Sequence, residues 1–335
     1  MVRFAVIGTS SITREFIRLS KKVKNFELAA VYSRSMKTAE RFATEVGAPL
    51  VFDDLKELAR SDRVDAVYIA SPNICHKEQT LLMIDGNKHV LVEKPAAPSK
   101  EDFLEMERAA KQKGVVMLEA MRAAFVNGTF AIKDALSKIG EVRRATISFC
   151  QYSSNYDKYK SGEYCNTFNP ELANGSLMDL GVYCTRAAVY LFGEPRSVKA
   201  AVTRLPNGFD AQGSVICEYD GMLVELRFSK VSAGKIENEI QGEKGTMLID
   251  DMFYPSDVRI VYLDGTTETV YTEKTESWGG LNFEAAAFVD MIEKGVSPDE
   301  YNRQTEMTLA IMDEVRRQQQ IDFVNPMRSQ GPNVR

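Results

Sequence analysis

The sequence predicts an α/β protein in which an N-terminal, doubly wound parallel sheet precedes an α+β domain with a large, mostly antiparallel sheet. Three observations lead to this fold class. The first third of the chain alternates short apolar runs with helical segments, and these runs are apolar throughout, as strands covered on both faces must be. Later runs alternate apolar and polar residues between turns. With 335 residues, the chain is also too long for one ordinary core, so two domains are expected.

The first domain is expected over residues 1–121. Its strands are predicted at Val2–Ile7, Glu27–Tyr32, Leu50–Phe52, Val64–Ala70, Val90–Glu93 and Val115–Leu118. Its helices are predicted at Ile12–Val23, Met36–Val46, Asp54–Arg60, Cys75–Asp85 and Lys100–Lys113. Strands that alternate with helices in this way form right-handed crossovers, which predicts a parallel sheet with helices on both faces.

The second domain is expected over residues 122–324. Its first elements are predicted to be a helix at Val126–Lys138, a strand at Val142–Gln151, an irregular polar and aromatic stretch at Tyr152–Asn174, and a helix at Ser176–Phe192. Strands follow at Ser197–Thr203, Gly213–Tyr219, Met222–Ser229, Lys235–Gln241, Thr246–Ile249, Val258–Leu263 and Thr267–Tyr271. Asp220-Gly221 and Asp264-Gly265 are typical hairpin turns, which favours antiparallel pairing. Closing helices at Phe283–Lys294 and Arg303–Gln319 are expected to pack back on the first domain, and residues 325–335 are expected to be a loose tail.

Composition excludes several classes of function. A formal net charge of −5 gives no electrostatic reason to bind nucleic acid or an anionic membrane surface, and no apolar run approaches the roughly 20 residues that span a bilayer. The five cysteines are scattered, without a closely spaced pair, and no secretion signal is recognisable, so we expect reduced thiols and a cytoplasmic location. Because the chain has only two histidines and no HExxH motif, we expect no metal site.

A glycine turn joins the first predicted strand to the first helix, with the sequence Gly8-Thr9-Ser10-Ser11-Ile12-Thr13. In a dinucleotide-binding fold the turn at this place is tight, and the pyrophosphate rests on the helix N-terminus. A plain Ser/Thr helix cap is the alternative. The position after the first strand of a βαβ series favours the cofactor interpretation, with Gly8, Thr9, Ser10, Ser11 and Ile12 as binding residues.

The second predicted strand ends at Ser33-Arg34, about 20 residues beyond the glycine turn, where NAD-preferring folds carry an acidic residue for the ribose 2′-hydroxyl. A hydroxyl and a guanidinium suit a 2′-phosphate, which a carboxylate would repel. The pair therefore favours NADP, with NAD as the second choice. An exposed arginine at a strand end is the alternative.

Two more polar stretches end predicted strands at the same sheet edge. Ser71-Pro72-Asn73 follows one strand, with His76 in the next helix; this loop is expected to line the nicotinamide ribose, whereas His76 is either part of the site or a helix-start residue without contacts. Glu93-Lys94-Pro95 follows the apolar run 89–92 and brings charge to the edge where open α/β sheets bind ligands. Lys94 is thus placed where a nicotinamide and a carbonyl could meet.

Asp179 and Tyr183 lie four residues apart in a predicted helix, so their side chains share one face. Gly181 between them is unfavourable in a helix interior unless something approaches the backbone closely. A ketone reduction needs a proton donor, and the pKa of a tyrosine, about 10 when unperturbed, falls near a cation such as Lys94. An amphipathic helix with a hydrogen-bonded Asp179 is the alternative.

Together these motifs resemble the glucose–fructose oxidoreductase/inositol dehydrogenase (Gfo/Idh/MocA) family along nearly the whole chain. The resemblance implies an NAD(P)-binding Rossmann domain and a C-terminal sheet domain that holds substrate and often forms an oligomer. It implies that Lys94 orients and polarises the substrate and that Asp179 neighbours it. We count Glu93 and Lys94 among the expected cofactor-binding residues as well. Many members carry histidine at the position of Tyr183; the branch with tyrosine is similar to the dimeric dihydrodiol and NADP-xylose dehydrogenases, where Tyr183 would be the acid/base.

We therefore predict an NADP(H)-dependent oxidoreductase that transfers hydride between nicotinamide and a sugar, polyol or related hydroxy/carbonyl compound. A small-molecule substrate and a homo-oligomer through the C-terminal sheet are expected, with no nucleic acid or membrane partner. A non-catalytic cofactor-binding sensor on the same fold is the alternative, and a pure assembly protein would not need Glu93-Lys94-Pro95. Trp278, Tyr156, Tyr159 and Tyr164 are either substrate contacts or packing residues.

Overall fold

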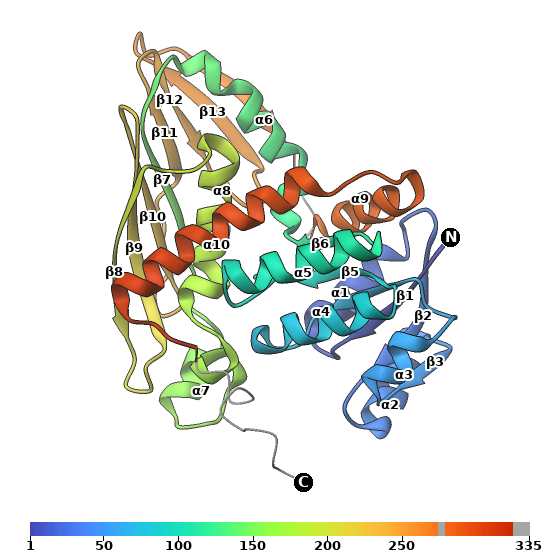
Figure 1. Cartoon of the computed structure of the whole chain (residues 1–335). Helices are drawn as coiled ribbons and strands as arrows, with labels where there is room; N and C mark the ends of the chain where they lie inside the picture. The colour runs from blue at the N-terminus through green and yellow to red at the C-terminus, as the bar shows by residue number, and fades with distance from the viewer. Residues whose placement is uncertain (274–278, 324–335) are drawn as a thin grey trace. The chain divides into compact units, whose positions relative to one another are not determined.

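The computed structural model of the chain describes residues 1–273 and 279–323 (Figure 1). They form two compact units. The first comprises Met1–Phe125 with the described residues of Ser277–Glu306, and the second comprises Val126–Glu276 and Met307–Arg335, again as far as they are described. Trp278 and the predicted tail at 325–335 lie outside the described residues.

The first unit contains a six-stranded parallel sheet in the order β3-β2-β1-β4-β5-β6. The strands are β1 (Val2–Ile7), β2 (Phe26–Tyr32), β3 (Leu50–Phe52), β4 (Ala66–Ile69), β5 (His89–Glu93) and β6 (Met117–Ala120). The helices are α1 (Ser11–Ser20), α2 (Met36–Val46), α3 (Leu55–Arg60), α4 (His76–Asp85), α5 (Lys100–Lys113) and α9 (Leu281–Lys294). Helices α3, α4 and α5 pack side by side, while α1 packs against α2 and α9. All four residues of β4 are buried, as a central strand covered on both faces requires.

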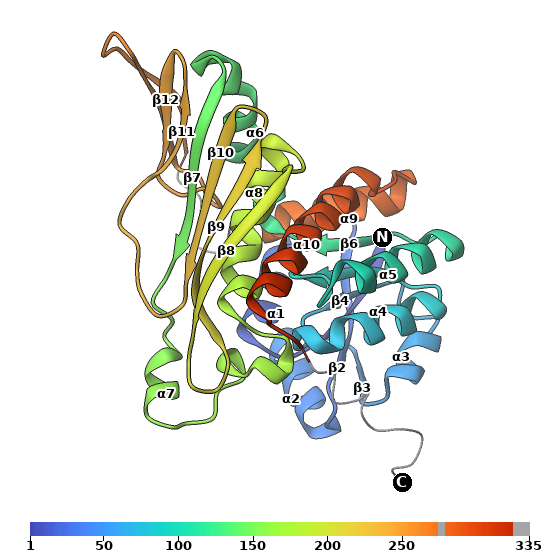
Figure 2. The ribbon, with the colours of Figure 1, turned by 60° about the vertical axis from the view of Figure 1, so that its left-hand side comes forward.

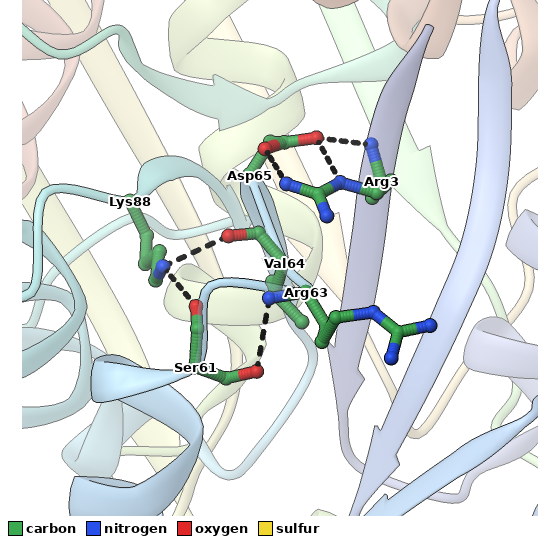
Figure 3. A network of polar contacts seen from close by, with 6 residues as sticks. All are labelled: Arg3, Ser61, Arg63, Val64, Asp65 and Lys88. Atoms are coloured by element: carbon green, nitrogen blue, oxygen red, sulfur yellow. Dashed lines mark hydrogen bonds and ion pairs between the residues drawn. The ribbon is translucent and has the colours of Figure 1, made fainter.

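A polar network joins the amino ends of three strands of this sheet (Figure 3). Arg3 on β1 donates through its backbone N–H and its guanidinium to the carboxylate of Asp65, and this partner lowers the pKa of Asp65. Lys88, which is buried just before β5, donates to the carbonyl oxygens of Ser61 at 2.5 Å and Val64 at 2.8 Å. Ligands of open α/β sheets bind at the opposite, carboxyl edge, so this network holds the strands in place.

Helix α9 and the start of α10 (Asp299–Gln319) complete the first unit although they come late in the chain. Phe288 on α9 packs edge-on against Phe4 of β1, with ring centroids 6.0 Å apart. Asn302 and Thr305 on α10 donate to Met117 O at 3.1 Å and to Glu119 Oε2 at 2.9 Å, both on β6. The core of this unit is therefore built from both ends of the sequence.

The second unit is built on an eight-stranded sheet in the order β14-β13-β12-β11-β7-β10-β9-β8. The strands are β7 (Val142–Cys150), β8 (Ser197–Arg204), β9 (Asp210–Tyr219), β10 (Met222–Ser229), β11 (Asn238–Gly242), β12 (Gly245–Ile249), β13 (Asp257–Tyr262) and β14 (Thr267–Thr272). Only the central β7–β10 pair is parallel. Gly221 and Gly265 adopt the left-handed conformation in the β9–β10 and β13–β14 hairpins, as the sequence predicts. The predicted fold class is confirmed in both units.

Helices cover one face of this sheet (Figures 1 and 2). Helix α8 (Val182–Phe192) packs on β7 and β10, while α6 (Asn127–Ala135) packs near β14. The edge strand β8 is covered by the end of α10: Gln318 bonds the backbone of Val198 and Ala200, and Gln319 bonds that of Ala200 and Val202. Their amides thus occupy backbone groups that an edge strand would otherwise leave open to another chain.

The structure differs from prediction mainly between residues 152 and 192. The stretch expected to be irregular contains α7 (Tyr156–Lys160) and two 3₁₀ turns, η4 (Asn166–Phe168) and η5 (Pro170–Leu172). The single helix expected over Ser176–Phe192 begins instead with a π-helical turn, η6 (Leu177–Gly181), followed by α8. Gly181 explains the change, because a Cβ there would lie 3.1 Å from Phe228 of β10, so the backbone approaches the sheet closely.

Candidate active site

Three of the predicted site segments meet at the carboxyl edge of the parallel sheet. The strand order reverses at β1, so β1 and its neighbour β4 flank the switch point where ligands of such sheets bind. Gly8 follows β1, Ser71 comes two residues after β4, and Lys94 follows β5. The structure therefore brings the glycine turn, the Ser71 loop and Lys94 to one edge of one sheet.

The glycine turn has the geometry that a close ligand needs. Gly8 has φ +113°, and a Cβ on it would lie 2.5 Å from Ala70 O, so only glycine fits. Ser10 is extended and begins α1; its hydroxyl lies 3.4 Å from that of Thr13 and makes no cap to the helix backbone. Ser10 therefore does not cap the helix with its side chain, which was the alternative interpretation of this turn. Because the first N–H groups of a helix lack intrahelical partners, the start of α1 is suited to an anion.

Ser33 and Arg34 follow β2 at the same edge. Ser33 is held by its backbone N–H, which donates to Phe52 O at 3.1 Å, while the Arg34 side chain is exposed. No ion pair of Arg34 occurs among the residues that the structure describes. Burial raises the pKa of the neighbouring Tyr32 even though the positive charge of Arg34 opposes the rise. Arg34 is therefore a cation available to a ligand at the end of β2.

His76 braces the two loops at the edge. It is fully buried, with Nδ1 2.9 Å from Pro95 O and Nε2 2.9 Å from Ser71 O. Burial lowers its pKa, although both carbonyl contacts act in the other direction. The alternative of a helix-start residue without contacts is wrong: His76 ties the segment after Lys94 to the loop after β4. Ser71 Oγ is 2.7 Å from Gln79 Oε1, and Pro72 and Asn73 begin the turn between them.

Glu93 and Lys94 are anchored from within the sheet. Tyr68, fully buried on β4, donates its hydroxyl to Glu93 Oε1 at 2.5 Å, and its ring stacks on Phe16 of α1 at 3.7 Å. Glu93 Oε2 accepts the backbone N–H of Lys94 at 3.1 Å. Burial raises the pKa of Glu93, while the Lys94 charge and the Tyr68 hydroxyl act to lower it. Lys94 itself is half-buried, and the Lys94–Pro95 peptide bond is cis.

Two further carboxyls, missed by sequence reasoning, lie behind this segment. Glu119 on β6 accepts the N–H of Ala96 at 2.9 Å and so fixes the chain just after Pro95. Glu284 on α9 is fully buried, and neither of its carboxyl oxygens has a hydrogen-bond partner within the described part of the chain. Burial raises its pKa far above the usual range, and the nearby Glu93 adds to the rise. A charged residue inside an otherwise apolar run, as in MLEA, was the available signal for Glu119.

Asp179 and Tyr183 lie in the second unit on the η6–α8 segment. Asp210, the first residue of β9, fixes its start: Oδ2 accepts Leu177 N–H at 2.7 Å, and burial raises the pKa of Asp210 to about 7. Asp179 forms an ion pair with Lys230, a residue that sequence reasoning also missed. Because η6 is π-helical, the four-residue spacing of Asp179 and Tyr183 falls partly in a wider turn than an α-helix gives.

Tyr183 is held by aromatic side chains. Its ring packs edge-on against Phe149, with centroids 5.5 Å apart, and at a tilt against Phe253, with centroids 5.4 Å apart; only 6% of the residue is exposed. Tyr156 and Tyr159 both stack on Phe168 at 5.6 Å, which is packing, whereas Tyr164 is exposed. Among residues 1–273 and 279–323, no group of three His, Cys, Asp or Glu side chains is placed to hold a metal ion.

The fold and the sheet-edge segments define a class: a nucleotide-binding α/β domain joined to a second domain with a large mixed sheet. Residues 2–121 match the family model described as "Oxidoreductase family, NAD-binding Rossmann fold", and residues 132–248 match the GFO/IDH/MocA C-terminal domain. None of the helices described is long and apolar enough to cross a membrane.

Individual relatives agree with these matches. The chain is 46% identical to scyllo-inositol 2-dehydrogenase (NADP(+)) of Bacillus subtilis over 96% of its own length and 98% of the relative's. It is 26% identical to trans-1,2-dihydrobenzene-1,2-diol dehydrogenase of Oryctolagus cuniculus, covering 93% and 97% of the two chains. The crystal structure of KijD10, a 3-ketoreductase of Actinomadura kijaniata, shares the fold with a TM-score of 0.80, at 23% identity over 94% of this chain and 96% of that one.

The chain belongs to the Gfo/Idh/MocA family of oxidoreductases. The resemblance drawn from the sequence motifs is thereby confirmed, and the chain is an NAD(P)-dependent oxidoreductase rather than a pure assembly protein.

Proposed function

We propose that the protein is an NADP(H)-dependent dehydrogenase that acts on the CH–OH group of a sugar, polyol or related hydroxy/carbonyl compound. The observation that carries the proposal is the convergence of Gly8, the Ser71 loop and Lys94 at the switch point of the parallel sheet. The 46% identity to a polyol dehydrogenase named as NADP(+)-dependent supports both the substrate class and the cofactor.

The residues present fit NADP. The Gly8 turn leaves no room for a Cβ, and the adjoining start of α1 would hold the pyrophosphate, with Thr9, Ser10, Ser11 and Ile12 around it. The exposed guanidinium of Arg34, with Ser33, would hold the 2′-phosphate. Ser71, Pro72, Asn73, Glu93 and His76 would shape the nicotinamide side, His76 through the backbone that it braces. When bound, the nicotinamide supplies the hydride acceptor or donor.

Each catalytic residue has one task. In oxidation, Lys94 stabilises the negative charge that develops on the substrate oxygen as the carbinol hydrogen leaves as hydride. Tyr183 takes the hydroxyl proton, and in reduction it returns that proton. Asp179 accepts a hydrogen bond from a substrate hydroxyl. In this proposal residues 1–121 are the cofactor domain and 122–324 the substrate domain, except that α9 and the start of α10 belong to the unit of the cofactor domain.

The direct test is a steady-state screen of cyclic polyols, aldoses and dicarbonyls with NADP+ or NADPH, followed at the nicotinamide absorbance. Turnover of a polyol or sugar supports the proposal. NADPH binding without turnover of any compound in the screen would favour a sensor instead, and absence of nucleotide binding would contradict both.

We also propose that the chain forms a homo-oligomer, most simply a dimer, through the outer face of the eight-stranded sheet, and that it works in the cytoplasm. Ile216 on β9 and Leu223 on β10 expose apolar side chains on that face, at 42% and 36%, beside Glu225 and Arg227. In the proposed interface these two apolar side chains form the centre and the charged residues form the polar rim. All five cysteines are free thiols, as expected in a reducing compartment.

A further inference from the structure

Lys230 is an unusual lysine. It directly follows β10, is 5% exposed, and pairs through Nζ with Asp179 Oδ2. Lysines are rarely buried unless paired, because removing the ammonium from water is costly. A buried lysine that meets the carboxylate of a candidate substrate-site residue therefore needs a reason beyond packing.

The surroundings fix the ammonium in place. The backbone N–H of Lys230 donates to Ala211 O at 3.0 Å, and its carbonyl accepts the N–H of Ser153 at 2.9 Å. Its Nζ lies 5.9 Å from the ring centroid of Phe168, which is itself buried against Phe209 at 4.8 Å. The lysine is thus held by two neighbouring segments of backbone and covered by an aromatic layer.

The partner carboxylate is equally constrained. Asp179 lies in the π-helical turn whose start Asp210 fixes, and that turn packs against β10, the strand that Lys230 follows. The Asp179 side chain is 38% exposed while that of Lys230 is 6% exposed, so the pair has one buried end and one open end. This arrangement turns the Asp179 carboxylate in one direction.

We propose that Lys230 is a positioning residue for the reaction: it holds Asp179 as a fixed, anionic acceptor for a substrate hydroxyl next to the reacting carbon. The inference rests on the proposed function and narrows it. A fixed acceptor built into the site selects compounds with a neighbouring hydroxyl, because a compound without that hydroxyl forms one hydrogen bond fewer. The substrate class is then a vicinal polyol or sugar, rather than an isolated alcohol or ketone.

The test compares kcat/KM for a vicinal polyol, such as scyllo-inositol, and for a deoxy analogue that lacks the hydroxyl next to the reacting carbon. Lys230→Met keeps the unbranched stem of the side chain and removes the ammonium group with its charge. We expect kcat/KM for the polyol to fall by roughly 10–100-fold, the range typical when a residue that orients a binding side chain is removed. The fall in kcat/KM for the analogue should be much smaller. NADPH binding stays unchanged, and Lys230→Arg restores part of the activity because it restores the charge.

Lys88→Met is the matched control, since Lys88 is also buried but bonds only to backbone carbonyls at the other edge of the parallel sheet. It should alter stability and leave the polyol-to-analogue ratio at the wild-type value. In an Asp179→Asn background, Lys230→Met should add little, because both changes remove one interaction.

Two results would overturn the positioning role and leave the proposed function intact. One is a folded Lys230→Met variant that prefers the polyol over the analogue as strongly as the wild type does. The other is a double variant whose loss of activity equals the sum of the losses from Lys230→Met and Asp179→Asn. If Lys230→Met does not fold, Lys230→Gln, which also removes the charge, is compared with Lys230→Arg, which keeps it. A wild-type enzyme inactive on every polyol and sugar would overturn the proposed function, and the inference with it.

Discussion

Three lysines show how the setting of a residue decides what it does. Lys88 lies before β5 and donates to backbone carbonyls, whereas Lys94 lies just after the same strand, at the ligand edge of the sheet. Lys230 follows β10 and pairs with Asp179. All three lie at or near the ends of apolar runs in the sequence, and their different contacts follow from which end of a strand each one occupies.

The roles proposed for Lys94 and Tyr183 can be separated from cofactor binding. Lys94→Ala should lose most turnover while NADP(H) still binds, since in the proposed mechanism its charge stabilises the substrate oxygen. Tyr183→Phe removes one oxygen and keeps the contacts of the ring with Phe149 and Phe253, so turnover should fall by roughly 10²–10⁴-fold with little change in unfolding. Single-turnover kinetics and nucleotide fluorescence measure the two effects. Tyr190→Phe on the same helix should be silent; near wild-type turnover in Tyr183→Phe would move the acid/base role elsewhere.

Arg34 should determine the preference for NADP. Arg34→Ala removes a charged hydrogen-bond partner from the 2′-phosphate, which typically costs about 1.5–3 kcal/mol, or roughly a 10–100-fold weaker Kd for NADP(H). NAD(H) lacks that phosphate, so its Kd should hardly move. Titration calorimetry with both nucleotides is the measurement, and Arg18→Ala, on α1 beside Glu15, is the control. Equal affinity of the wild type for the two nucleotides would contradict this role.

At the scale of elements, the η6–α8 segment depends on the contact between Asp210 and the helix start. A Cβ on Gly175 would lie 1.8 Å from Asp210 Oδ1, so glycine is required just before the turn. The contact brings a carboxyl into the interior, and burial raises its pKa to about 7 from 3.8. The start of this segment is therefore coupled to a titrating group.

That coupling makes stability depend on pH. The folded pKa of Asp210 lies above the unfolded one, so its contribution is greatest below about pH 4 and is lost as pH rises toward 7. The slope is at most ~1.4 kcal/mol per pH unit, because one proton is involved. Asp210→Asn keeps an acceptor for Leu177 N–H but cannot titrate. Relative to wild type, its free energy of unfolding should improve from pH 5 to pH 7 in urea titrations.

Asp65→Asn is the control for this measurement, because Arg3 lowers the pKa of Asp65. The pKa of Asp65 then lies below pH 5 in both the folded and the unfolded state. The difference in free energy of unfolding between Asp65→Asn and wild type should therefore not change between pH 5 and pH 7. A pH-independent difference for Asp210→Asn as well would show that Asp210 is ionised throughout.

Sequence patterns predicted the elements whose formation depends on local apolar periodicity. β1, β3, α2, α5 and β10 have the expected bounds, and both Asp-Gly hairpins form. The π-helical turn was not predictable, because it depends on how closely Gly181 approaches Phe228, 47 positions later in the chain. The position of Lys94 directly after a predicted strand was enough to place it at the sheet edge. The burial of His76 and the Tyr68–Glu93 hydrogen bond were not predictable, because they depend on contacts between separate strands and loops. Lys230 was missed because the rule that ligands bind at the carboxyl edge of a sheet applies to parallel sheets, and Lys230 follows a strand of the mostly antiparallel one.

At the scale of the whole molecule, association should depend on the outer face of the large sheet. Light scattering should show a species of at least twice 37.5 kDa at micromolar concentration. Leu223→Glu places a charge beside Glu218, its partner across the β9–β10 pair, and should shift the protein toward the monomer. Leu263→Glu, at a more exposed position in the β13–β14 hairpin, should not. A wild-type protein that runs only at 37.5 kDa would refute the proposed interface.

The first unit is assembled from two separate stretches of chain, and this has a consequence for biosynthesis. Strands β1–β6 are synthesised before residues 126–276, whose addition takes on the order of 8–30 s at ~5–20 residues per second. Throughout that interval Phe288, which packs on Phe4, and Thr305, which donates to Glu119, have not yet been synthesised. The nascent parallel sheet therefore carries an uncovered apolar face while the second unit is still being translated, and the cell must keep that face from aggregating until α9 arrives.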